Sequence, residues 1–253
     1  MDMDKFTGKK ILIIGASSGI GKQTAIQLSR QGATLFLVAR REDKLQEVLD
    51  LLQGQGHGCM TADMSDVGSL DGMFREIRKN FGVLDGMVYT AGMTATMPLN
   101  MLKPEKLMNV MTVHFFSFVE AVRQFSRRGR YGEKAGIVVM SSVSAKCGDR
   151  GHTAYASAKA AIEGAVRCLA DELAEKGINI NAVVAGLTRT EMMRGFLDNN
   201  GEDSDAYRKI IERQYLGIGE PEDIANVICF LLSPEARFIT GASVPADGGY
   251  TAC

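Results

Sequence analysis

The sequence is short of the features that mark secreted or membrane-embedded proteins. Its five cysteines are odd in number and form no Cys-x-x-Cys pair, which predicts reduced thiols rather than a disulfide framework. No apolar run approaches the ~18 residues of a membrane helix, and the polar start MDMDKFTGKK is unlike a signal peptide. We therefore expect a cytoplasmic protein without a membrane anchor.

An excess of charge of one sign is also lacking, and histidine is scarce. The formal net charge of −1 gives no reason to expect nucleic acid or a membrane surface as a partner. Of the three histidines, His57 lies in a glycine-rich turn and His152 just before a predicted helix, with no second ligand at metal-binding spacing. We expect loop roles for both residues and no metal ion.

Short apolar runs are abundant, and they alternate with amphipathic segments. The strand-like runs cover residues 10–16, 33–39, 58–63, 84–92, 136–142, 180–186 and 242–248. The helix-like segments lie near residues 19–31, 42–53, 66–80, 104–125, 153–176 and 221–233. This alternation predicts an α/β fold: a single-domain, Rossmann-type doubly wound parallel sheet of about seven strands over residues 1–253, with helices on both faces.

The polar segment 188–220 interrupts this rhythm. It contains DNNGEDSD and follows the sixth predicted strand, at the sheet edge where α/β proteins place their ligands. We expect a substrate lid there.

A glycine-rich turn follows the first predicted strand. In GASSGIGKQTA, Gly15, Gly19 and Gly21 allow a tight turn, close approach to a pyrophosphate and close packing of the next helix. A simple strand-to-helix connection is the alternative, since a glycine-rich turn by itself is a weak signal. The position after the first strand favours the phosphate site.

The end of the second predicted strand indicates which dinucleotide is bound. NAD-binding folds place a carboxylate there for the ribose hydroxyls, whereas this sequence reads VARRED. Ala39 removes the carboxylate, and Arg40 and Arg41 offer forked donors to a 2′-phosphate. The pattern favours NADP(H) over NAD(H), the alternative being an arginine pair that only solvates a helix start.

A tyrosine and a lysine stand one helical turn apart in GHTAYASAKAAIEGA. If this stretch is helical, Tyr155 and Lys159 leave the same face of the helix. An ammonium near a phenol favours the phenolate and lowers the phenol's pKa, which would create a general acid or base. An ordinary surface helix is the alternative reading of this pair.

GASSGIG, the serines at 141 and 142, YASAK and the ending ITGASVPADGG together resemble the short-chain dehydrogenase/reductase family over essentially the whole chain. In that family the tyrosine is the acid/base catalyst, the lysine lowers its pKa and holds the nicotinamide ribose, and a serine polarises the substrate carbonyl. The resemblance assigns these roles to Tyr155, Lys159 and Ser142. Its implied cofactor-binding residues are Gly15, Ser17, Ser18, Gly19, Ile20, Gly21, Arg40, Arg41, Asp63, Met64, Ala91, Gly92, Tyr155, Lys159, Gly186, Thr188 and Thr190.

The sequence departs from the family pattern at several positions. Ile14 replaces a threonine, Tyr89 and Thr90 replace two asparagines, and Ala185 replaces a proline. A further departure touches catalysis, because the helix position of the family's relay asparagine falls on His114. Imidazole can donate and accept protons, so His114 either joins the proton relay or hydrogen-bonds passively as a neutral group.

The resemblance implies an NADPH-dependent oxidoreductase acting on a carbonyl or secondary alcohol, most similar to 3-oxoacyl-(acyl-carrier-protein) reductases. Sugar, steroid and small-alcohol substrates stay open, as does a non-catalytic NADP(H)-binding sensor or scaffold. The basic segment 123–134 is either a solvated helix end or a docking site for an acidic carrier protein. The family commonly pairs helices like HFFSFVEAV and YASAKAAIEGAVRCLADEL between subunits, which implies a homotetramer.

Overall fold

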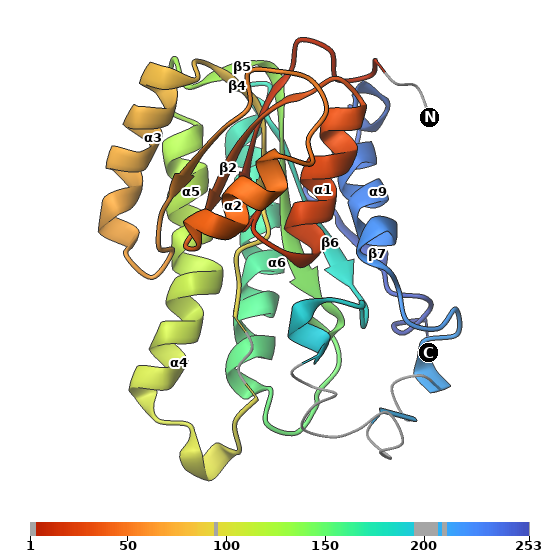
Figure 1. Ribbon diagram of the computed structural model, residues 1–253. Coiled ribbons are helices and arrows are strands. Elements are labelled where there is room, and N and C mark those ends of the chain that lie inside the picture. Colours follow the sequence, from red (N-terminus) through yellow and green to blue (C-terminus); the bar gives the residue numbers. More distant parts are fainter. Residues whose placement is uncertain (1–3, 94–95, 195–206, 209–211, 253) are drawn as a thin grey trace.

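The fold is organised around one parallel β-sheet (Figure 1). The computed structural model describes residues 4–93, 96–194, 207–208 and 212–252. Strands are hydrogen-bonded in the order β3-β2-β1-β4-β5-β6-β7, and every neighbouring pair is parallel. The strands are β1 (Lys10–Ile14), β2 (Thr34–Ala39), β3 (Gly58–Thr61), β4 (Leu84–Tyr89), β5 (Tyr131–Ser142), β6 (Asn179–Ala185) and β7 (Ser243–Ala246).

Helices cover both faces of this sheet, which confirms the predicted doubly wound α/β fold (Figure 1). The helices are α1 (Gly19–Arg30), α2 (Glu42–Leu49), α3 (Leu70–Asn80), α4 (Pro104–Met111), α5 (Ser117–Phe125), α6 (Thr153–Ala174) and α9 (Pro221–Leu232). Short 3₁₀ turns cover Val67–Ser69, Leu99–Met101, Val143–Ala145 and Pro234–Ala236.

The strands bury their side chains on both faces because the sheet lies between two helical layers. In β1, Ile11 and Ile13 pack with α1, α2 and α9, whereas Leu12 and Ile14 pack with α3, α5 and α6. Successive strand residues point to opposite faces, so one apolar run supplies two cores. The continuous apolar runs in the sequence follow from this requirement.

The order of the strands reverses between β1 and β4. From β1 the chain adds β2 and β3 on one side, and it then returns to place β4 and the later strands on the other. At such a switch point the connections leave in opposite directions and open a crevice at the carboxyl ends of the strands. The last residue pair of β1 and β4 is Ile14 and Tyr89, and the candidate site lies directly beyond it.

Two elements differ from the sequence-based expectation. β5 begins at Tyr131 rather than residue 136, because Tyr131 already pairs with Leu84. The pairing then shifts in register before residue 136. The charged residues in this first part of β5 interrupt the apolar run, so the sequence does not show that the strand begins there. The helix expected over 104–125 contains a π-helical turn at Thr112–Phe116, where the Ser117 N–H bonds the carbonyl of Thr112. The Ser117 hydroxyl also contacts the Met64 carbonyl oxygen, a long-range contact that no local pattern reveals.

Candidate active site

A cavity of about 550 Å³ lies at the carboxyl ends of the strands. Every residue for which the sequence predicted a catalytic or cofactor-binding role lines it. The structure thus brings together side chains from the turn after β1 to the segment after β6. Their chemical roles stay predictions.

The turn between β1 and α1 is shaped as a close-fitting cradle. Gly15 has φ of +94°, and a Cβ on it would lie 2.5 Å from the Ala91 nitrogen. A Cβ on Gly21 would lie 2.2 Å from the Gly15 carbonyl oxygen. The Ser18 side chain makes no capping hydrogen bond to α1, so the N–H groups in the first turn of this helix remain available to the cavity. This is the arrangement by which helix N-termini bind phosphate, and the residues therefore fit a dinucleotide.

At the end of β4, Tyr89 and Thr90 depart from the family pattern, but their hydrogen bonds support this cradle. The Thr90 hydroxyl lies 3.0 Å from the Ile14 carbonyl oxygen and 3.1 Å from that of Gly15, so it ties the end of β4 to the turn. The Tyr89 hydroxyl donates to the Val113 carbonyl at 2.8 Å and holds the π-helical turn against the sheet. Both side chains replace asparagines of the family pattern with other hydrogen-bond donors.

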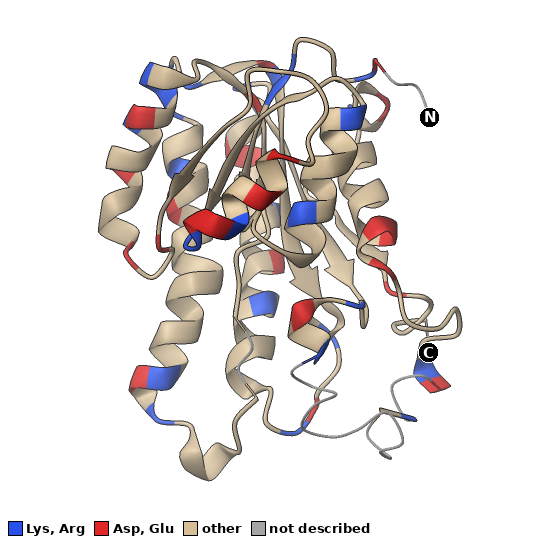
Figure 2. Ribbon diagram, in the orientation of Figure 1, with Lys and Arg blue, Asp and Glu red and all other residues tan. Residues whose placement is uncertain are grey.

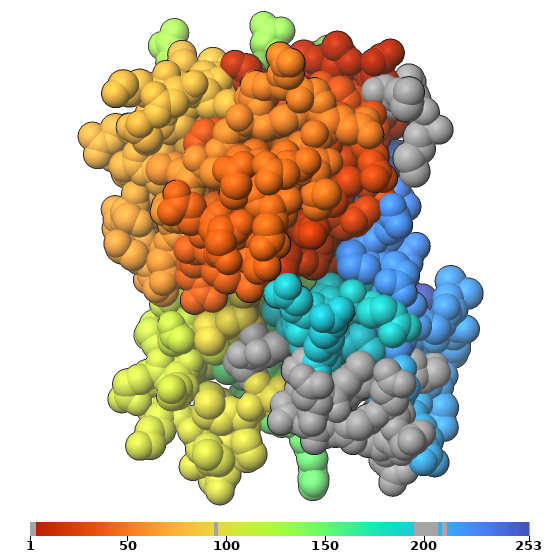
Figure 3. Space-filling model, in the orientation of Figure 1, coloured from red at the N-terminus to blue at the C-terminus, as the bar shows by residue number. Residues whose placement is uncertain are grey.

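The arginines at the end of β2 lie at one rim of the cavity. Both are exposed, and the Arg41 Nη2 is 3.4 Å from Ser17 Oγ and 3.4 Å from Glu191 Oε2. The segment after β6 thereby lies against the N-terminal part of the chain, cyan against orange in Figure 3. Nearby, a hydrogen bond from the Ser65 backbone lowers the pKa of Asp63, and the charge of Arg40 adds to this effect.

Tyr155 and Lys159 lie one turn apart on α6, and Ser142 ends β5 beside them. Lys159 is buried, its Nζ donates to the Met140 carbonyl at 2.8 Å, and it lies 5.6 Å from the centre of the Tyr155 ring. Ser142 Oγ accepts from the Ser144 N–H at 3.2 Å. The surface-helix alternative is wrong for this pair, because both residues line the cavity.

The expected effect of the ammonium on the phenol is not what the structure shows. Burial raises the pKa of Tyr155, and its hydrogen bond with Ser142 partly offsets this effect. Burial also lowers the pKa of Lys159 to about 7, so its charge is fractional near neutral pH. The lysine is bonded to a carbonyl rather than to the phenol oxygen. Tyr155 is thus held as a neutral phenol, the form that donates a proton.

His114 lies in the π-helical turn and faces the same tyrosine. Its ring is buried and meets the Tyr155 ring edge-to-face, with centroids 5.3 Å apart and planes at 88°. Nε2 lies 3.0 Å from the carbonyl oxygen and 3.1 Å from the nitrogen of Met93. Burial, with a smaller contribution from the Lys159 charge, lowers the pKa of His114 to about 3. These contacts favour the passive role, in which a neutral imidazole holds the Met93 loop.

We therefore expect His114→Asn to lower kcat/KM by less than about tenfold, or about 1.4 kcal/mol of transition-state stabilisation. A group with a pKa of about 3 stays neutral at all higher pH values, so its removal leaves the pH profile unmoved. The measurement is kcat/KM against pH for both proteins. A larger loss, or the disappearance of an inflection between about pH 6 and 7, would show that the imidazole passes the proton.

Several residues at the cavity were not predicted as functional, and two of them contact each other. His152 and Thr96 both line it, with 3.0 Å between the Thr96 Oγ1 and the His152 Nε2. His152 was expected to be a loop residue; its position three residues before Tyr155 was the available signal. His57 is structural, as its Nδ1 accepts from the Leu35 N–H at 3.1 Å and its Nε2 lies 2.9 Å from the Gln53 carbonyl.

The described part of the predicted lid is anchored to the end of β6. Gln214 Oε1 accepts from the Leu187 N–H at 2.8 Å, and Gln214 Nε2 donates to the Leu187 carbonyl at 2.9 Å. A Cβ on Gly186 would lie 2.6 Å from Gln214 Oε1 and 2.8 Å from the Asp247 Cα, so the close approach of this backbone requires glycine. Residues 195–206 and 209–211 of the predicted lid lie outside the described residues, and lid closure stays a prediction.

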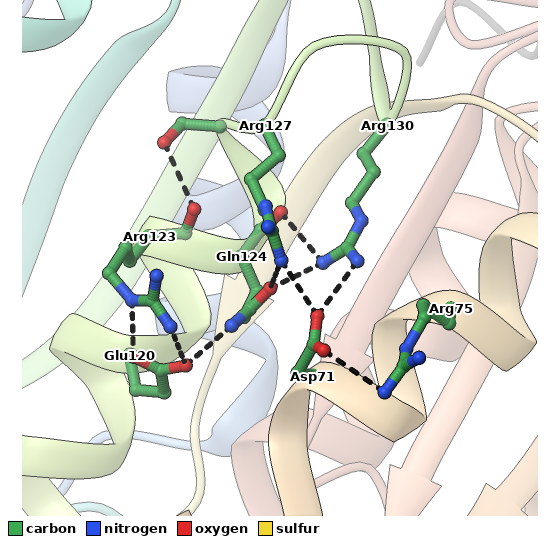
Figure 4. Close-up of polar contacts among 8 residues, drawn as sticks. Asp71, Arg75, Glu120, Arg123, Gln124, Arg127 and Arg130 are labelled. Atoms are coloured by element: carbon green, nitrogen blue, oxygen red, sulfur yellow. Dashed lines mark hydrogen bonds and ion pairs between the residues drawn. The ribbon is translucent and has the colours of Figure 1, made fainter.

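Three arginines of the basic segment 123–134 form ion pairs within the chain (Figure 4). Arg123 pairs with Glu120 at 2.7 Å, and Arg127 and Arg130 converge on Asp71 at 2.8 and 3.0 Å. In Figure 2 basic and acidic residues are likewise interspersed along the ribbon. This pairing reduces the positive field that the segment presents to an acidic partner.

Within residues 4–93, 96–194, 207–208 and 212–252, no group of His, Cys, Asp and Glu could hold a metal ion. In the same ranges no helix has the length and apolar character needed to cross a membrane.

The strand order and the cavity at the switch point define the class of this protein as a Rossmann-type dinucleotide-binding fold. A family model described as Enoyl-(Acyl carrier protein) reductase matches residues 15–251. A 3-oxoacyl-[acyl-carrier-protein] reductase of Escherichia coli (strain K12) is 33% identical, and the aligned region covers 96% of this chain and 98% of the relative. A glucose 1-dehydrogenase of Gluconobacter oxydans (strain 621H) is 34% identical, with coverage of 98% and 94%.

Solved structures agree with these relatives. A dehydrogenase/reductase from Sinorhizobium meliloti 1021 superposes with a TM-score of 0.89 at 31% identity, covering 99% of this chain and 98% of its own. A short chain dehydrogenase from Burkholderia cenocepacia J2315, solved in complex with NADP, has a TM-score of 0.85 at 28% identity, covering 97% and 99%. The chain belongs to the short-chain dehydrogenase/reductase family and is an NAD(P)-dependent oxidoreductase.

Proposed function

We propose that residues 1–253 form a single NADP(H)-dependent domain that interconverts a carbonyl compound and a secondary alcohol. The observation that carries the proposal is the convergence of Ser142, Tyr155 and Lys159 on one cavity that Arg40 and Arg41 also line. The arginines suit a 2′-phosphate, and NADP is also the ligand named for the Burkholderia cenocepacia relative. The glycine cradle would hold the pyrophosphate, and the bound nicotinamide would supply the hydride.

The side chains then provide the proton and the geometry. A carbonyl oxygen that gains negative charge during reduction needs a donor within hydrogen-bond reach, and the neutral Tyr155 phenol provides it. Ser142 can donate a second hydrogen bond to the same oxygen. Lys159, fixed on the Met140 carbonyl, would bind the nicotinamide ribose and return a proton to the tyrosine.

A panel of carbonyl compounds tests this function. NADPH oxidation is followed with 3-oxoacyl thioesters, diketones, keto sugars and ketosteroids, since the relatives' names include both an acyl-carrier-protein substrate and glucose. Turnover that depends on Tyr155 supports the proposal. Tight NADPH binding without oxidation of any compound would instead favour the non-catalytic sensor or scaffold.

We also propose that the protein assembles as a homotetramer. Apolar side chains of α4 and the following π-helical turn are exposed, with Met108 at 57% and Phe116 at 40%. Such a surface suits burial against a second copy. We expect light scattering at micromolar concentration to give four times the 27.4 kDa chain mass. Met108→Glu should lower this mass and Lys106→Glu should not; a monomer mass for the unmodified protein would contradict the proposal.

A further inference from the structure

Glu191 places a carboxylate beside the arginines at the rim of the cavity. Ala39 ends β2 without an acidic side chain, but Glu191 reaches the same rim from the segment after β6. Its Oε2 lies 3.4 Å from the Arg41 Nη2, and both side chains line the cavity. The negative charge that is missing from β2 is therefore supplied by a distant part of the chain.

The main chain next to Glu191 is held against the glycine turn. The Arg189 N–H donates to the Gly219 carbonyl at 2.8 Å, which anchors the segment on one side. A Cβ on Gly19 would lie 3.3 Å from the Thr190 Cγ2, so the segment also packs directly on the turn between β1 and α1. These contacts keep the carboxylate at the rim of the cavity.

Each arginine of the rim has one carboxylate beside it. The charge of Arg40 contributes to the lowered pKa of Asp63, and Glu191 pairs with Arg41. The Asp63 carboxylate also accepts from the Ser65 N–H at 2.9 Å, whereas Glu191 extends to the guanidinium with 56% of its side chain exposed. The formal charges of the two arginines and the two carboxylates cancel before a ligand binds.

A 2′-phosphate must bind at this balanced rim. It carries a charge of about −1.5 to −2 at pH 7 and is best held by the forked donors of an arginine. If Arg41 kept Glu191 while binding the phosphate, the two anions would lie within about 6 Å, inside the ~10 Å Debye length at 0.1 M salt. Exposed ion pairs contribute little to folding stability, so the pair acts mainly on what Arg41 can bind.

We propose that Glu191 is a specificity-determining residue, which weakens binding of NADP(H) relative to NAD(H) by competing for Arg41. This inference rests on the proposed function, in which the arginines hold the 2′-phosphate. NAD(H) lacks this phosphate, so its binding neither displaces the carboxylate nor is opposed by it. The arginines thus set the direction of the cofactor preference, and Glu191 limits its size.

Nucleotide fragments test the inference without any turnover. Calorimetry compares adenosine 2′,5′-bisphosphate with 5′-AMP, which differs from it only by the missing 2′-phosphate. Glu191→Gln removes the charge and keeps the approximate shape, so it should tighten binding of the bisphosphate at least about threefold and change that of 5′-AMP less than about 1.5-fold. An unchanged or weaker affinity for the bisphosphate, or an equal gain for both nucleotides, overturns the inference.

Glu220→Gln is the matched control for this variant. Glu220 pairs with Arg189 at 2.9 Å, has 54% of its side chain exposed and does not line the cavity. Its neutralisation changes the net charge of the protein by the same amount, and it should alter the affinity for neither nucleotide. A gain of equal size in this variant would trace the effect to overall charge and overturn the role of Glu191.

A double-mutant cycle tests whether Glu191 acts through Arg41. In an Arg41→Ala background the carboxylate is free to turn toward solvent, so Glu191→Gln should tighten binding of the bisphosphate less than about 1.5-fold. The full gain in that background would overturn competition for Arg41.

These binding measurements separate the inference from the proposed catalysis. A protein that reduces no carbonyl compound would fail the proposed function, yet a gain in bisphosphate affinity that needs both Glu191 and Arg41 would still support the inference. Conversely, a Glu191→Gln protein with unchanged affinities overturns the inference while leaving Tyr155-dependent turnover of ketones unaffected.

Discussion

Tyr155→Phe is expected to lower kcat by at least about a hundredfold, the usual scale for loss of a general acid. The change removes only the hydroxyl, and the ring keeps its neighbours Lys159 and His114. NADPH binding should therefore stay nearly intact. The measurement is steady-state kcat for the most active carbonyl together with the NADPH dissociation constant.

Two variants serve as controls for this experiment. Tyr131→Phe removes a hydroxyl outside the cavity and should leave kcat unchanged. Lys159→Ala should weaken both turnover and NADPH binding, because it also removes the group that would bind the nicotinamide ribose. Near-normal turnover in the Tyr155→Phe protein would show that another group donates the proton.

The unmodified protein should prefer NADPH to NADH by well over tenfold, and tenfold alone corresponds to about 1.4 kcal/mol. Arg40 and Arg41 are exposed at the rim of the cavity, where forked donors suit a 2′-phosphate and no carboxylate of β2 opposes it. Replacing both with Ala should abolish the preference, mainly by weakening NADPH binding. The comparison is kcat/KM for each dinucleotide.

Lys44→Ala is the matched control for this pair. Lys44 is a cation on α2 that pairs with Glu47 at 2.7 Å and does not line the cavity. Its removal should leave the preference intact. Equal use of NADPH and NADH by the unmodified protein would contradict the assignment of the arginines.

The elements of the fold could be read from the sequence because their signals are local. Seven apolar runs matched β1–β7 to within a few residues at most boundaries, and Pro104 and Pro221 begin helices at the expected places. The glycine spacing after β1 is partly local, since a Cβ at Gly21 would lie 2.2 Å from the carbonyl oxygen of Gly15 in the same turn. The position of Lys159 after Tyr155 follows from helical geometry alone.

The sequence by itself therefore determined the fold class and the glycine turn after β1, and it supplied a tyrosine, a lysine and a serine as the predicted catalytic residues. The tertiary structure decided their state: burial sets the pKa of Lys159 near 7, and the Met140 carbonyl takes its ammonium. It also decided that a π-helical turn presents a neutral His114 and that Thr96 orients His152. Desolvation and hydrogen bonds between distant segments control these properties, and neither leaves a periodic signal along the chain.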